Sequence, residues 1–212
     1  MMDPNHEIAV LTCDIIESSL LSADELKEYQ QKIESLGDEW ILILPQFYRG
    51  DSFQLATKPV DALEIAIKIR IEMKRIHEKN DVRVSVGIGQ VSTLNENVLF
   101  STGTAFEISG KNLDQLKSRK LNLLIQTEDP LLNDELETNC YFADTIINGF
   151  TKIQSNIIFY KMQGLDQAGI ANILDVSQPA ISKSLKTANW QTIERFLKRY
   201  KNLINQNYGS TD

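Results

Sequence analysis

Cysteine is scarce in this sequence: Cys13 and Cys140 are the only two among 212 residues, and they form no CxxC pair. Two cysteines cannot form the disulfide framework of a small secreted domain, so that class is excluded. Cys13 lies in an apolar stretch with no histidine placed to activate it, and we interpret it as a buried strand residue rather than a nucleophile. The cysteine content predicts a protein of the reducing cytoplasm.

Long hydrophobic runs are absent as well. No stretch approaches the roughly 18 apolar residues of a membrane span. The first residues, MMDPNHEIAVLTC, place no basic segment ahead of their short apolar run, so they do not resemble a signal peptide. We therefore expect no membrane partner. The hydrophobic fraction of 42% and the charged fraction of 24% are those of an ordinary globular protein.

Positive charge is outnumbered by negative charge in the first three quarters of the chain. The net charge is −7, but residues 161–212 hold seven basic and four acidic residues, a charge of +3, which leaves −10 for residues 1–160. An acidic front and a basic tail indicate two domains with different partners. The basic tail is the part that could approach phosphates.

Hydrophobic periodicity predicts an α+β protein. Strands are expected at residues 7–13, 40–47, 52–57, 82–88 and 121–126. Helices are expected from the capping box Ser22-Ala-Asp-Glu25 to Gly37, after Pro59, and over residues 103–116. Pro45 predicts an edge strand or a bulge. The lysines, arginines and glutamates of residues 64–78 predict a solvated helix face.

The first six of these elements follow the order β-α-β-β-α-β of the ferredoxin-like fold. In that fold the first and third strands are central and adjacent, so the end of the first strand lies beside the tip that joins the second and third. Asp14 ends the first strand and Asp51 follows Gly50 at the tip. The two carboxylates are expected to meet, although 37 positions separate them in the sequence.

A pair of carboxylates at adjacent strand ends makes an oxygen-rich site. Mg²⁺ or Mn²⁺ suits such a site, usually together with substrate phosphates. The alternative is that Asp51 is only a turn residue and Asp14 only caps a loop or helix. The sequence leaves both interpretations open, with Asp14 and Asp51 as the candidate metal ligands.

The stretches AVLTCDIIESS, YRGDSF and VRVSVGIGQVS together resemble the class III nucleotidyl cyclases, and they are also similar to diguanylate cyclases. The resemblance implies that Asp14 and Asp51 hold metal ions, and we expect a nucleotide to contact Gly50 and Ser52 beside them. Phe47 stands where those cyclases usually have a base-reading lysine, and Ser52 where diguanylate cyclases have a glutamate. No arginine or matching asparagine for the transition state is found in residues 103–112, so no catalytic residue is assigned.

The stretch LDQAGIANILDVSQPAISKSLKTANW predicts a helix-turn-helix. Ile170, Ala171 and Leu174 form the inner face of its first helix, Asp175 makes the turn, and Ser177 caps the second helix. Ile181 and Leu185 then point inward. The candidate DNA contacts on the outer face are Gln178, Ser182, Lys183 and Lys186. The alternative is a helical packing domain that only looks like this motif.

The combination of GDSFQ, VGIGQVST, GTAF and SQPAISKSLKTANW resembles the SatD family of bacterial proteins. The resemblance spans the chain from its first strand to Trp190, and it implies a cyclase-like domain joined to a helix-turn-helix. We place the boundary within residues 128–150, with the cyclase-like domain at 1–145 and the all-α DNA-binding domain at 146–212. The resemblance to the SatD family implies architecture more than activity.

We expect a cytoplasmic DNA-binding protein, a transcriptional regulator, whose first domain binds a metal or nucleotide or mediates dimerisation. The rival is a divalent-metal nucleotidyl cyclase with a regulatory helical tail, and a third reading is a structural dimer with a vestigial site. The apolar face of residues 190–204 exceeds what a three-helix headpiece needs, so a homodimer is expected.

Overall fold

A single five-stranded mixed sheet organises the structure, a computed structural model that describes residues 7–36 and 41–209. The strand order is β2-β3-β1-β4-β5, and only the β4–β5 pair is parallel. The strands are β1 (Glu7–Ile15), β2 (Ile41–Tyr48), β3 (Ser52–Thr57), β4 (Val82–Gln90) and β5 (Leu123–Gln126). The α+β class predicted from the sequence is confirmed.

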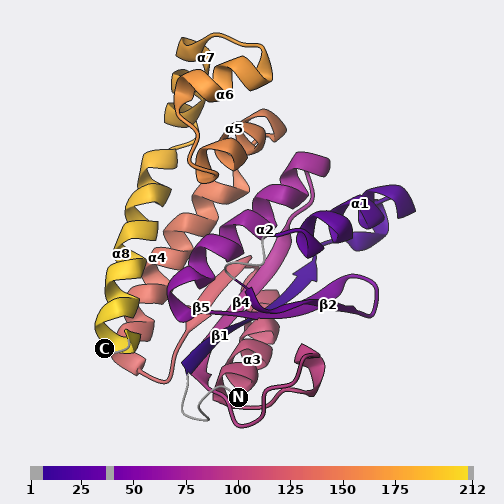
Figure 1. Ribbon diagram of the computed structural model, residues 1–212, viewed down its shortest axis with the longest axis vertical. Helices are drawn as coiled ribbons and strands as arrows, with labels where there is room; N and C mark the ends of the chain where they lie inside the picture. The colour runs from indigo at the N-terminus through magenta and orange to yellow at the C-terminus, as the bar shows by residue number, and fades with distance from the viewer. Residues whose placement is uncertain (1–6, 37–40, 210–212) are drawn as a thin grey trace.

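Helices cover both faces of this sheet and then extend away from it (Figure 1). They are α1 (Ala23–Glu34), α2 (Ala62–Ile76), α3 (Thr104–Arg119), α4 (Pro130–Asn148), α5 (Lys152–Met162), α6 (Gln167–Leu174), α7 (Gln178–Thr187) and α8 (Trp190–Tyr208). In the described part of the chain, none of these helices has the length and apolar character that crossing a membrane requires.

The two faces of β1 belong to different cores because side chains alternate along a strand. Leu11 and Cys13 join the large core beneath α1 and α2. Val10 joins a smaller core with Ala105 of α3. Both cysteines of the chain are buried and form no disulfide, and burial raises the pKa of the Cys13 thiol well above its usual value. Cys13 is thus a strand residue of the core, as expected.

The predicted order β-α-β-β-α-β is confirmed, and β1 lies between β3 and β4 in the sheet. Ser22 forms the predicted capping box with Glu25. β2 is an edge strand whose pairing register shifts between Ile43 and Gln46, around Pro45, as the proline predicted. The predicted helix end at Gly37 and strand start at Trp40 lie outside the described residues.

The segment expected to hold a domain boundary is instead the long helix α4. Asp129 caps it by accepting a hydrogen bond from the Leu131 backbone, and Pro130 occupies its first turn. Apolar side chains at helical spacing face the core: Leu132, Leu136, Cys140, Ala143 and Ile147. The predicted border between residues 145 and 146 falls inside this helix, and the division into 1–145 and 146–212 stays a prediction.

The prediction of a solvated face on α2 is wrong, because Arg70, Glu72 and Lys74 are all buried. The helix is enclosed by the sheet on one side and by α1, α5 and α8 on others. Arg70 is fully buried and makes a two-pronged ion pair with Asp81 at the start of β4, with N–O distances of 2.9 and 2.6 Å. Its Nη1 also donates to Asp144 of α4 at 2.7 Å.

Charge pairing controls the protonation of this buried network. Burial alone would raise the pKa of the Asp81 carboxyl, but Arg70 and Lys74 more than offset that effect, so the pKa lies below its usual value. Asn148 accepts a further hydrogen bond from Arg70 at 2.6 Å. The network therefore joins α2, the start of β4 and α4 through a cation whose three nitrogens each donate to an acceptor inside the protein.

The apolar face of α8 packs within its own chain. Ile193, Tyr200 and Ile204 are buried, and the Tyr200 hydroxyl donates to the Pro59 carbonyl oxygen at 2.6 Å. Arg199 of the same helix pairs with Glu135 of α4. The excess hydrophobicity that suggested a homodimer is thereby used inside the chain, and the homodimer stays a prediction without support from α8.

Replacement of Arg70 by methionine should destabilise the fold by about 3–5 kcal/mol, because Asp81 and Asp144 would remain buried without their main cation. Arg119→Met is the matched control: it removes an exposed arginine that pairs with Glu137, and it should cost less than about 1 kcal/mol. Urea denaturation measures both values. Equal losses in the two variants would contradict the assigned role of Arg70.

The loss of unfolding free energy caused by Arg70→Met should become smaller as the pH falls. In the native protein the lowered pKa of Asp81 means that its contribution is complete above about pH 4 and is lost as the pH falls through that lowered pKa. In the variant, protonation of the unpaired carboxyl relieves the buried charge instead. The unfolding free energies of the native protein and the variant, measured by denaturation between pH 7 and pH 3, should converge. A difference that stays constant over this range would argue against this assignment.

Candidate functional site

The structure brings Asp14 and Asp51 together at one end of the sheet. Asp14 lies opposite Ser52 in the β1–β3 register, and the Ile15 amide donates to the Asp51 carbonyl at 3.0 Å. The Ser52 hydroxyl lies 3.2 Å from Asp14 Oδ1 and 3.4 Å from Asp51 Oδ1. One buried hydroxyl thus stands between the two carboxylates, which meet where the sequence placed them.

Gly50 fixes the shape of the tip rather than making room for a neighbour. Its φ is +84° and that of Arg49 is +58°, so two consecutive residues adopt the left-handed conformation. A Cβ at Gly50 would meet nothing within 4 Å. The Gly50 carbonyl accepts a hydrogen bond from Gln30 of α1 at 3.2 Å. Of the two predicted nucleotide contacts, Gly50 is exposed at the tip and Ser52 is buried between the carboxylates.

Three side chains that sequence reasoning missed complete the site. Arg83 of β4 donates to Asp14 Oδ2 at 3.1 Å, and Lys117 of α3 lies 3.5 Å from the same oxygen. Ser18 donates to Asp51 Oδ2 at 2.8 Å. The sequence held a signal for Arg83: it stands between the buried Val82 and Val84, and alternation places it on the opposite face of the strand. No sequence pattern pointed to Lys117.

Two acidic and two basic side chains make this a site of balanced charge. Within the described ranges no group of three or more histidine, cysteine, aspartate or glutamate residues is placed to hold a metal ion. A divalent cation here would rely on Asp14 and Asp51, with water or phosphate oxygens completing its shell, as is usual for Mg²⁺. Arg83 and Lys117 are suited to the phosphate. In the structure Asp14 Oδ2 is paired with Arg83 and Lys117, and a phosphate group would compete for those two cations.

The glycine-containing strand VGIG lies under α3 and takes no part in this site. A Cβ at Gly87 would lie 2.3 Å from the Ala105 carbonyl oxygen, and one at Gly89 would lie 2.4 Å from Thr104 Oγ1. Both glycines therefore let α3 approach β4 closely. The Ser85 hydroxyl, on the same face, donates to the Ser109 carbonyl at 2.6 Å and holds the helix in place.

The tail forms the two helices that its sequence predicted. Ile170 and Ala171 of α6 and Ile181 and Leu185 of α7 are buried against one another and their surroundings. Asp175 ends α6 in the left-handed conformation, with φ 52° and ψ 49°. This geometry turns the chain within residues 175–177 and starts α7 at Gln178.

The outer face of α7 is polar and accessible. All four candidate DNA contacts are exposed: Gln178, Ser182, Lys183 and Lys186. Ser177 occupies the N-cap position in extended conformation, but its side chain makes no capping hydrogen bond, so its predicted capping contact is wrong. Figure 1 shows α6 and α7 together at the far end of the molecule from α3, beyond α5.

Comparisons with known proteins assign no family. No family model and no curated protein matches the chain. Among solved structures, the chain is similar to a bacterial light-regulated adenylyl cyclase, with 12% sequence identity and a TM-score of 0.43. That match covers 56% of this chain and 42% of the other, so the chain spans less than half of the cyclase's length.

The substitution Asp51→Asn should abolish the rise in melting temperature that Mg²⁺ or Mn²⁺ with a nucleoside triphosphate produces, because the cation would lose one of two carboxylates. Asp114→Asn, a neutralised exposed carboxylate of α3, should keep that rise. Lys117→Gln should weaken the nucleotide effect by removing a phosphate partner. A thermal-shift assay measures all three variants, and an unchanged response in Asp51→Asn would rule out Asp51 as a ligand.

Proposed function

We propose that the protein binds DNA through α6 and α7 and acts as a transcriptional regulator. The observation that carries the proposal is the division of α7 into two faces: Ile181 and Leu185 are buried, and Gln178, Ser182 and Lys186 are exposed. A recognition helix needs this division, because one face must anchor in its domain while the other enters the major groove.

The position of the helix pair supports the same proposal. A groove about 12 Å wide admits one helix only if its neighbours leave its outer face clear. α5 supports α7 from behind, where the Gln154 side-chain amide donates to the Thr187 hydroxyl at 3.3 Å. The pair stands at one end of the molecule (Figure 1), so DNA could approach α7 without meeting the sheet.

The sheet part is proposed to be a ferredoxin-like, cyclase-like domain, the architecture that the resemblance to the SatD family implies, and to bind a divalent cation with a nucleotide. The meeting of Asp14 and Asp51 at the hairpin tip supports this, as do the two cations beside Asp14. In this arrangement the first domain senses a ligand and the second binds DNA.

The rival proposal is a nucleotidyl cyclase-like enzyme, which the same carboxylate pair favours. Phe47, at the position expected for a base-reading lysine, packs on Phe53 with ring centroids 4.8 Å apart. It is a packing residue of the β2–β3 hairpin, so base recognition would need another side chain. This observation speaks against the enzyme, and the regulator is therefore the first proposal.

A homodimer remains part of the proposal for a reason independent of α8. One helix-turn-helix covers a single half-site, and two-fold dimers gain affinity and specificity from two half-sites. Light scattering at tens of micromolar protein, with and without DNA, measures the state of association. A monomer in both conditions would remove the dimer from the proposal and leave the single-site contacts of α7.

Two substitutions on α7 should separate the residue that reads a base from the residue that contacts phosphate. Gln178→Ala should relax preference at one base pair and cost about 1–3 kcal/mol there, because an amide can read a base edge. Lys186→Ala should weaken binding to all sequences alike and lower the salt slope by about one. Fluorescence anisotropy on a DNA site selected from random sequences, at several salt concentrations, separates the two effects.

Lys111→Ala is the matched control for these measurements. Lys111 is an exposed lysine that pairs with Glu107 at 3.7 Å. Its helix, α3, lies at the other end of the molecule from α7 (Figure 1). Its loss removes the same unit of charge and should leave the salt slope unchanged. If Lys111→Ala and Lys186→Ala weaken binding equally, only the overall charge matters and α7 is not the DNA-binding element.

A further inference from the structure

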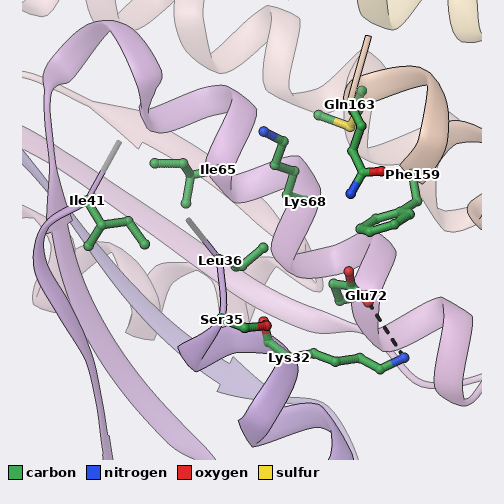
Figure 2. A pocket seen from close by; sticks show the side chains of 10 residues that line it. Lys32, Ser35, Leu36, Ile41, Ile65, Lys68, Glu72, Phe159 and Gln163 are labelled. Atoms are coloured by element: carbon green, nitrogen blue, oxygen red, sulfur yellow. Dashed lines mark hydrogen bonds and ion pairs between the residues drawn. The ribbon is translucent and has the colours of Figure 1, made fainter. Parts of the chain in front are cut away.

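A cavity of about 510 Å³ opens between α1, β2, α2 and α5, apart from the carboxylate site and from the outer face of α7. Figure 2 shows its lining around one space, with Phe159 and Gln163 on the α5 side and Ile65 and Lys68 on the α2 side. Five apolar side chains form its walls: Leu36, Ile41, Ile65, Phe159 and Met162. Cavities of this size with largely apolar walls hold small organic molecules.

The charged side chains in the described lining are all paired within the chain. The pairs are Lys32 with Glu28 at 3.0 Å, Lys68 with Glu64 at 3.3 Å, and Glu72 with Arg75 at 2.8 and 2.9 Å. An ion that entered the cavity would lose its water shell, and each counter-ion it met would already be engaged. The lining therefore disfavours a charge of either sign on a ligand.

Gln163 is the residue that can orient an uncharged ligand. The lining holds two uncharged polar residues, and the Ser35 hydroxyl already donates to the Lys32 carbonyl oxygen at 2.9 Å. The side-chain amide of Gln163 makes no hydrogen bond to any residue that the structure describes. Gln163 is exposed, which places it at the mouth of the cavity. Because an amide both donates and accepts, it can bind a hydroxyl, an amine or a carbonyl.

We propose that this cavity binds an uncharged, largely apolar small molecule, with its ring or chain against Ile65, Phe159 and Met162 and one hydrogen-bonding group at the Gln163 amide. The apolar walls take the body of the ligand, and the amide at the mouth takes its polar end. Removal of water from the ligand body and from the five apolar side chains supplies the driving force.

The ligand would touch the helix that supports α7. Phe159 and Met162 belong to α5, and Gln154 of the same helix donates to Thr187 at the end of α7 at 3.3 Å. An effect of the ligand on DNA affinity rests on the proposed function. Binding in the cavity does not, so it is measured without DNA, and its failure is distinct from a failure of DNA binding.

Fluorescence titration with two probes that share one ring system tests the charge of the ligand. N-phenyl-1-naphthylamine is uncharged, and 8-anilino-1-naphthalenesulfonate adds a sulfonate to the same rings. The native protein should bind one uncharged probe per chain, about ten-fold more tightly than the sulfonate, because the sulfonate would give up water without gaining a free cation. Equal or tighter binding of the sulfonate, or no saturable binding of the uncharged probe, would overturn the proposal.

A tryptophan at the mouth tests the place of binding. Gln163→Trp should weaken binding of the uncharged probe by about ten-fold, since the new ring covers apolar surface that the probe would otherwise bury. Gln191→Trp is the matched control, the same exchange at an exposed position of α8 outside the described lining, and it should bind as the native protein does. Equal affinities of the two variants would mean that the probe binds elsewhere, which contradicts the proposal.

Gln163→Leu tests the polar end of the ligand at nearly constant side-chain size. Displacement of the uncharged probe by 1-naphthol and by naphthalene, which differ in one hydroxyl group, gives the affinity of each. The affinity of 1-naphthol relative to naphthalene should fall by about five-fold in the variant, the weight of one ordinary hydrogen bond. An unchanged ratio would refute the assigned contact with Gln163.

Discussion

The buried guanidinium of Arg70 is the interaction on which the arrangement of the chain depends. A cation with no exposed surface is tolerated only where acceptors surround it, and here three acceptors do so: Asp81 before β4, and Asp144 and Asn148 of α4. None of these acceptors can move far without leaving a buried charge unpaired. The network therefore fixes α4 against α2 and the start of β4.

The tail is attached to the sheet part by several contacts of different chemistry. α8 runs beside α4 (Figure 1) and reaches back to the sheet part through the hydrogen bond from Tyr200 to Pro59. α5 lies on α2, where Arg75 stacks on Phe159 and donates to Asn156. One continuous core of buried apolar residues joins the sheet to the tail. α5 in turn contacts α7, so the helix pair is joined to α2 and the sheet by direct packing.

Sequence patterns predicted most elements and half of the candidate site. Period-two alternation and turn chemistry located the strands, and the order of elements brought Asp14 beside Asp51. Alternation placed Arg83 on the strand face opposite to the buried valines, but its approach to Asp14 depends on the register of β4. Lys117 could not be found this way, since its approach to Asp14 depends on the closeness of α3. Arg70 was misjudged because charge predicts exposure unless partners are known, and two of its acceptors lie on α4. The sequence also contains signals for α4, namely Asp129-Pro130 and apolar residues at helical spacing. They were not used because a domain boundary was predicted in the same segment.

The central claim is that α7 is the surface that meets DNA, and chemical-shift mapping tests it most directly. Backbone amide resonances of the 24.1 kDa protein would be followed while a selected DNA duplex is added. The account predicts that the largest changes cluster on residues 175–187, with smaller ones on the supporting helix α5. Changes confined to the β2–β3 tip around Asp51, or none at DNA concentrations well above those of the protein, would contradict it.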